Sequence, residues 1–105
     1  MRGADQLAAV ASTELGIDSV GIVFVGDAFG EASRRSFKDS FERTGGTVLF
    51  EERLPAELDG IGELARSVAR RNAPAVYVAA FGDALGLMVR QLGPSYSGTL
   101  LTTLE

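Results

Sequence analysis

Two hydrophobic periods alternate along the chain. Short, nearly continuous apolar runs are separated by longer segments in which apolar residues recur every three or four positions. The runs predict strands buried on both faces, and the longer segments predict amphipathic helices. The predicted strands are residues 19–25, 47–51, 75–80 and 99–102, and the predicted helices are residues 5–15, 28–44, 61–73 and 84–92. Alternating strands and helices with short connections indicate a mostly parallel sheet with helices on both faces.

Each of the first three predicted helices carries one apolar stripe. The third has the most regular pattern, with apolar residues at Ile61, Leu64, Ala65, Val68 and Ala69. In the second, Phe37 and Phe41 lie four positions apart on the side expected to be buried. The stripe expected in the first consists of Leu7, Ala8, Ala11 and Leu15. Gly16 follows at a position suited to end that helix.

Two strand-to-helix corners share the sequence Gly-Asp-Ala. The first strand is followed by Gly26-Asp27-Ala28-Phe29-Gly30, and the third by Phe81-Gly82-Asp83-Ala84. Glycine allows the chain to turn, and Asp27 or Asp83 would cap the helix that follows. Direct contact of either aspartate with a ligand is the alternative interpretation.

A flavodoxin-like strand order of 2-1-3-4 would place these two corners together. In that order the first and third strands are neighbours whose connections leave in opposite directions, so the loops at their carboxyl ends flank one crevice. Phe29 and Phe81 would then lie beside each other at its mouth, which suits an apolar or zwitterionic small molecule. Alternatively, Phe29 packs its own helix against the sheet.

Composition restricts the classes of function. The 105 residues form one domain, and a net charge of −4 with no basic patch argues against nucleic acid as a partner. Without cysteine or histidine, thiol catalysis, disulfides, soft-metal sites and a Ser-His-Asp triad are excluded. No apolar run is long enough to span a bilayer, and because the sequence leads straight into the first predicted helix we expect no signal peptide in it.

Charged clusters and glycine motifs do not indicate an enzyme or a cofactor. Gly26 and Gly30 do not complete a dinucleotide-binding fingerprint, and no P-loop occurs. The cluster of Arg34, Arg35 and Lys38 shares its helix with acidic residues, which favours a solvated face over an anion site. The neighbouring acids Glu51-Glu52 and Glu57 with Asp59 are interpreted as a surface loop rather than an acid/base pair. We therefore expect a non-catalytic protein without a cofactor.

The order of segments resembles one lobe of the type I periplasmic binding proteins, the branched-chain amino acid family. The motifs that carry this resemblance are Glu14-Leu15-Gly16, Asp27-Ala28-Phe29-Gly30, Gly45-Gly46-Thr47-Val48, Ala73-Pro74-Ala75-Val76 and Arg90-Gln91-Leu92-Gly93. They occur in the family's order and extend over nearly the whole chain. The resemblance implies that residues 1–105 form a single α/β domain, one lobe of a two-lobe protein.

The resemblance also implies a function. In such proteins a small polar solute, commonly an amino acid, binds between two lobes that close around it, and the complex delivers the solute to the permease of an ABC transporter. By this resemblance Phe29, Phe81 with Gly82, and Glu105 after the fourth strand line the ligand. The full set of predicted ligand-binding residues is Asp27, Phe29, Gly30, Phe81, Gly82, Asp83 and Glu105. The implied location of the parent protein is periplasmic or extracellular.

Only one lobe is represented, and this has two expected consequences. With about half of the ligand contacts missing, the chain by itself should bind weakly or not at all. Apolar surface that the rest of the lobe would cover should favour a homodimer. The rival hypothesis is a free-standing flavodoxin-like module, either a small enzyme or a protein-interaction domain. The native length of the protein would separate the two.

Overall fold

Strands and helices alternate throughout the computed structural model, which describes residues 2–54, 59–80, 82–93 and 96–102. The elements in chain order are α1 (Arg2–Thr13), β1 (Ser19–Phe24), α2 (Ala28–Arg43), β2 (Thr47–Arg53), α3 (Asp59–Arg71), β3 (Ala75–Ala79), α4 (Gly82–Leu92) and β4 (Thr99–Thr102). Each predicted strand and helix is therefore present, and the boundaries differ by a few residues.

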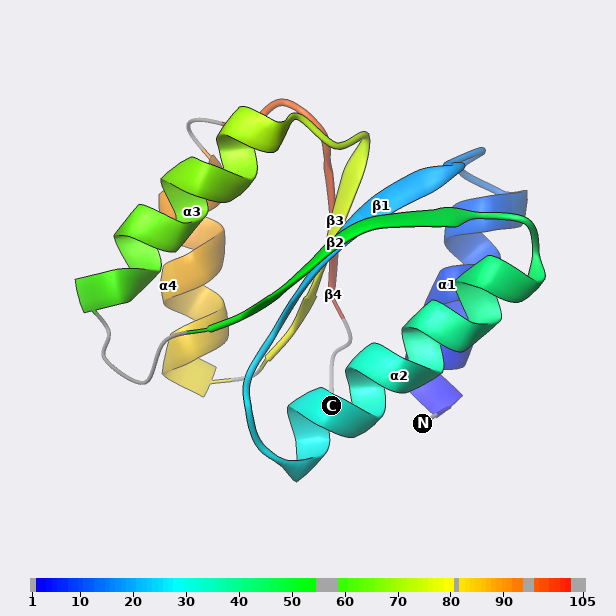
Figure 1. The fold of residues 1–105 in the computed structure, drawn as a ribbon, viewed down its shortest axis with the longest axis horizontal. Coiled ribbons are helices and arrows are strands. Elements are labelled where there is room, and N and C mark those ends of the chain that lie inside the picture. The colour runs from blue at the N-terminus through cyan, green and yellow to red at the C-terminus, as the bar shows by residue number, and fades with distance from the viewer. Residues whose placement is uncertain (1, 55–58, 81, 94–95, 103–105) are drawn as a thin grey trace.

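The four strands form one parallel sheet in the order β2-β1-β3-β4, which confirms the predicted order. Helices α1 and α2 cover one face, and α3 and α4 cover the other (Figure 1). The result is the three-layer, flavodoxin-like arrangement expected from the alternating hydrophobic periods.

The core lies in two parts, one on each face of the sheet. On the α1–α2 face, Phe37 stacks on Tyr77 of β3 with ring centroids 4.2 Å apart, and Phe41 stacks on Phe37 at 5.6 Å. Both phenylalanines are fully buried, as predicted. The prediction for Leu15 was wrong. Its side chain is 53% exposed, because α1 ends at Thr13 and Leu15 lies beyond the stripe.

A β-bulge in β2 sets the face to which each of its later residues points. Val48 pairs with Val20, but the next pair is Phe50 with Gly21, so Leu49 is an extra residue and remains 51% exposed. The Phe50 ring lies over Gly21, where a Cβ atom would overlap it. A larger residue at this position of β1 would therefore have to displace the aromatic ring of the neighbouring strand.

Strand β2 extends to Arg53, two residues beyond the predicted end. Glu52 consequently lies within the strand together with Glu51, which the predicted strand already contained, so the interpretation of this pair as a surface loop was wrong. Glu51 pairs with α2 through Arg34, and Glu52 pairs with α3 through Arg71, each at 2.7 Å. These cations allow two acidic residues to occupy the edge of a sheet. Of the other two acids, Asp59 begins α3, and Glu57 is outside the described residues.

Candidate functional site

The segments that follow β1 and β3 begin side by side at the carboxyl edge of the sheet. Phe24 pairs with Ala79, and the Val25 N–H donates a hydrogen bond of 3.0 Å to the Ala79 carbonyl. The connections then diverge, since α2 lies on one face of the sheet and α4 on the other (Figure 1). The prediction that the first and third strands are neighbours in the sheet is confirmed.

At the first corner, Asp27 caps α2. Its backbone is extended, and its Oδ1 accepts a hydrogen bond of 2.8 Å from the Gly30 N–H. A Cβ atom on Gly30 would overlap the Val25 carbonyl oxygen, so only glycine allows this first helical turn to pack against the strand end. The capping interpretation of Asp27 is confirmed. Contact of Asp27 or Gly30 with a ligand stays a prediction.

At the second corner, Asp83 does not cap α4. The helix begins at Gly82, two residues earlier than predicted, which places Asp83 within its first turn. Capping by Asp83 was therefore a wrong prediction, although a carboxylate near a helix N-terminus is still favoured by the helix dipole. Gly82 has a φ of 66°, which glycine adopts readily. Both residues are exposed at the carboxyl edge of β3.

The predicted aromatic pair is described only in part. Phe29 lies in the first turn of α2 and is partly buried. Phe81 and Glu105 lie outside the described residues. The contact between Phe29 and Phe81, and the ligand roles of Phe81 and Glu105, stay predictions.

Arg53 is a cation at the carboxyl edge that the sequence patterns did not identify. Its aliphatic stem lies close to Gly26, where a Cβ atom would come within 2.9 Å of the Arg53 Cδ. The side chain is 67% exposed and forms an ion pair of 3.4 Å with Glu31. The sequence analysis placed Arg53 in a loop and therefore did not consider it as a site residue. In the structure β2 extends to Arg53, which pairs with Phe24 of β1. The edge thus presents a guanidinium close to the first corner.

Next to this edge, an ion-pair network joins α2 to β2. Arg34 contacts Glu31 at 2.9 Å and Glu51 at 2.7 Å, while Lys38 contacts Glu51 at 3.2 Å. The hydrogen bonds that Arg34 donates to Glu51, and then those that it donates to Glu31, raise the pKa of Arg34. Burial alone would raise the pKa of the Glu51 carboxyl, but the bonds from Arg34 and Lys38 outweigh it and hold that pKa below its ordinary value.

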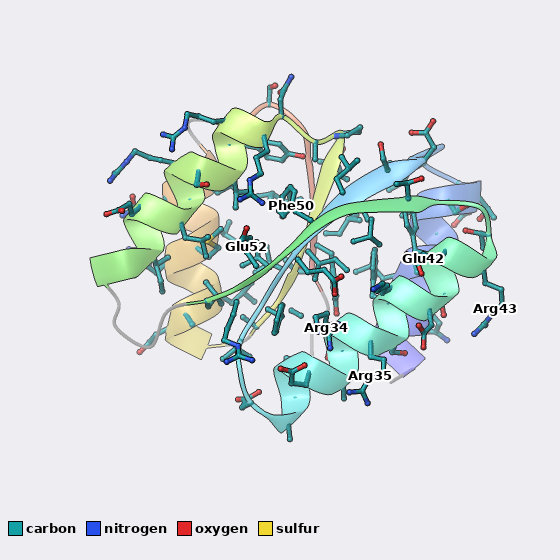
Figure 2. All side chains as sticks on the ribbon, in the orientation of Figure 1. Arg34, Arg35, Glu42, Arg43, Phe50 and Glu52 are labelled. Atoms are coloured by element: carbon teal, nitrogen blue, oxygen red, sulfur yellow. The ribbon has the colours of Figure 1, made fainter. Side chains whose placement is uncertain are left out.

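This network corrects the interpretation of the basic cluster on α2 as a merely solvated face. Arg34 and Lys38 are partly buried and paired with the edge strand, whereas Arg35 is exposed and directed away from the sheet (Figure 2). Both paired cations are thus neutralised by carboxylates.

The described part of the chain shows neither a candidate metal site nor a candidate membrane-spanning helix. Within it, no group of three or more acidic, histidine or cysteine side chains is arranged to hold a metal ion. The described helices are also too short or too polar to cross a bilayer.

A parallel sheet that is covered by helices on both faces, with the ends of β1 and β3 adjacent at one edge, defines a doubly wound α/β domain. The sequence profile of the periplasmic binding proteins matches residues 2–95, and the chain belongs to that family. The resemblance to the type I, branched-chain amino acid type is confirmed. No curated protein sequence matches the chain.

Solved structures with the same fold come from several bacteria. The leucine-binding protein LivK of Thermotoga maritima superposes with a TM-score of 0.82 at 21% identity, over 96% of this chain and 29% of that protein. An ABC-transporter solute-binding protein of Rhodopseudomonas palustris, in complex with 3,4-dihydroxybenzoic acid, superposes with a TM-score of 0.81 at 20% identity, over 96% of this chain and 29% of that protein. An ABC-transporter substrate-binding protein of Desulfitobacterium hafniense, in complex with Leu, superposes with a TM-score of 0.72 at 18% identity, over 96% of this chain and 30% of that protein. This chain thus spans less than a third of each of them.

Proposed function

We propose that this chain is a ligand-binding lobe of an ABC-transporter solute-binding protein. The observation that carries the proposal is the direct pairing of β1 with β3, from whose carboxyl ends the two Gly-Asp-Ala segments continue. Family membership supports a non-catalytic binding role rather than an enzyme. The rival interpretation as a free-standing α/β module has no comparable observation in its favour.

The proposed ligand is an amino acid or a similar small polar solute. The solved relatives with a bound molecule hold leucine in one case and 3,4-dihydroxybenzoic acid in another. Both ligands combine a carboxyl group with an apolar or aromatic body. Phe29 and Phe81 would contact that body, while Gly26 and Gly82 would let it approach the backbone closely.

The partners proposed for the parent protein follow from the family. A second lobe would complete the site and close over the ligand, and an ABC permease would receive it. The parent would act in the periplasm or outside the cell. By itself, the chain is proposed to form a homodimer, which light scattering at high protein concentration tests. A strict monomer would contradict that part of the proposal.

The binding site can be tested on the isolated chain by amide NMR during titration with leucine. We expect the amide signals of residues 26–30 and 82–84 to shift, and Phe29→Ala to weaken these shifts severalfold. Leu49→Ala is the matched control, because Leu49 is also a large apolar side chain but lies in the bulge of β2. Shifts confined to other regions, or an equal effect of both variants, would contradict the proposed site.

A further inference from the structure

Arg53 ends the edge strand β2 next to the first corner, and its side chain lies on the α2 side of the sheet. The residue pairs with Phe24, the last residue of β1, and its guanidinium carbon lies 6.0 Å from the centroid of the Phe24 ring. The stem of the side chain passes beside Gly26, and Nη2 contacts Glu31 in the first turn of α2. The guanidinium group is therefore located at the strand end from which the first corner of the proposed ligand site continues.

The charges around Arg53 do not cancel. Among the described residues, three cations share the carboxylates of Glu31 and Glu51, namely Arg34, Lys38 and Arg53. Arg34 and Lys38 make the shorter contacts, from 2.7 to 3.2 Å, whereas Arg53 reaches Glu31 at 3.4 Å. The two partly buried cations already match the two carboxylates, so one positive charge in excess remains on the exposed Arg53.

Most N–H groups of Arg53 have no protein acceptor in the described part of the chain. A guanidinium group carries five N–H donors in a planar fork. The hydrogen bond that Arg53 donates there comes from Nη2 and goes to Glu31 Oε2, and the side chain is 67% exposed. Asp27, the acid of the adjoining corner, instead accepts the Gly30 N–H at the N-terminus of α2. The remaining N–H groups of Arg53 are thus available to an oxyanion of a ligand.

We infer that Arg53 selects solutes with a free carboxylate at the first corner. This inference rests on the proposed solute-binding function, to which it adds the class of ligand and the residue that recognises it. Two N–H groups of a guanidinium can donate to the two oxygens of one carboxylate, a geometry that an amide group cannot match. Phe29, in the first turn of α2, would contact the apolar body while Arg53 holds the charged end.

Amide NMR of the full chain at pH 7 tests this role with benzoate and benzamide, which share a ring and differ in the charge of one group. We expect both to shift the amide signals of residues 26–30, and benzoate to bind at least fivefold more tightly than benzamide. Arg53→Gln should reduce this ratio to less than twofold, mainly by weakening benzoate. Arg53→Lys keeps the charge but not the planar fork, so its ratio should lie between these values.

Arg35→Gln is the matched control, because it removes the same charge from an exposed arginine of α2 that is directed away from the sheet (Figure 2). Its ratio should stay within twofold of wild type. A ratio that Arg53→Gln leaves unchanged, or lowers no more than Arg35→Gln does, would overturn the role of Arg53. If benzoate still shifted residues 26–30, the solute-binding proposal would stand. Absence of shifts at residues 26–30 and 82–84, with benzoate and leucine alike, would overturn both.

Discussion

Glycine at position 30 decides how closely α2 can approach the end of β1. The carbonyl oxygen of Val25 occupies the place where a Cβ atom would be, and backbone atoms cannot move aside as a flexible side chain can. Asp27 holds the same turn by accepting the Gly30 N–H. A single residue therefore fixes the geometry of the corner at which we place the ligand.

We expect Gly30→Ala to destabilise the fold by about 1–3 kcal/mol, the usual cost of overpacking. Gly86→Ala is the control. Gly86 lies inside α4, and the nearest atom to its Cβ position is the end of the Arg90 side chain at 3.9 Å. Alanine there should stabilise the helix by up to about 1 kcal/mol. Urea unfolding of the two variants measures both values, and a stabilising Gly30→Ala would contradict the close contact.

Strand β2 shows how an edge strand can be held between two helical layers. Its bulge at Leu49 directs Glu51 toward α2 and Glu52 toward α3, where each finds a cation. Figure 2 shows Phe50 and Glu52 on the side of β2 that faces α3. On that side Arg71 lies 4.7 Å from the centroid of the Phe50 ring. The ionic contacts thus continue the attachment of β2 beyond its apolar part.

Glu51 should make the stability of the fold depend on pH. Because its pKa is lowered on folding, its contribution is present above its unfolded pKa, near 4.5, and is lost as the pH falls through the folded value. Wild type should exceed Glu51→Gln in stability by up to about 1 kcal/mol at pH 7, since the pairs are partly exposed. That difference should shrink below about pH 4.5, where the carboxyl becomes protonated.

Urea unfolding across this pH range provides the measurement. Glu42→Gln is the control. Like Glu51→Gln, it removes one negative charge, but Glu42 is an exposed residue of α2 outside the ion-pair network of Arg34, Lys38 and Glu51. A stability difference between wild type and Glu51→Gln that does not change with pH would contradict the ionic origin of the effect.

The patterns of apolar residues in the sequence predicted the helices and strands well, because each of them is stabilised mainly by burial of its apolar side chains. They placed Phe37 and Phe41 in the core and put the first and third strands side by side. They missed the end of β2, because the bulge opposite Val20 and Gly21, which sets the faces of the charged residues that follow, has no local sequence pattern. Arg53 escaped notice for the same reason, since its place beside Gly26 depends on that extended strand.

At the scale of the whole molecule, we propose that the chain provides one side of a binding site. It covers 29% of the leucine-binding protein of Thermotoga maritima with a TM-score of 0.82. The carboxyl ends of its strands share one edge, which a parallel sheet makes available to a ligand and to a second domain. A ligand bound at this edge would contact the chain on one side and the rest of the parent protein on the other.

The affinity of the isolated chain should reflect this half-site. A complete site that binds leucine at about 1 μM has a free energy of about −8 kcal/mol, and losing roughly half of the contacts leaves about −4 kcal/mol, or about 1 mM. Calorimetry on the isolated chain and on its full-length parent should therefore give dissociation constants that differ by about three orders of magnitude. Submicromolar binding of leucine by the chain alone would contradict this expectation, because residues of one lobe would then suffice to enclose the ligand.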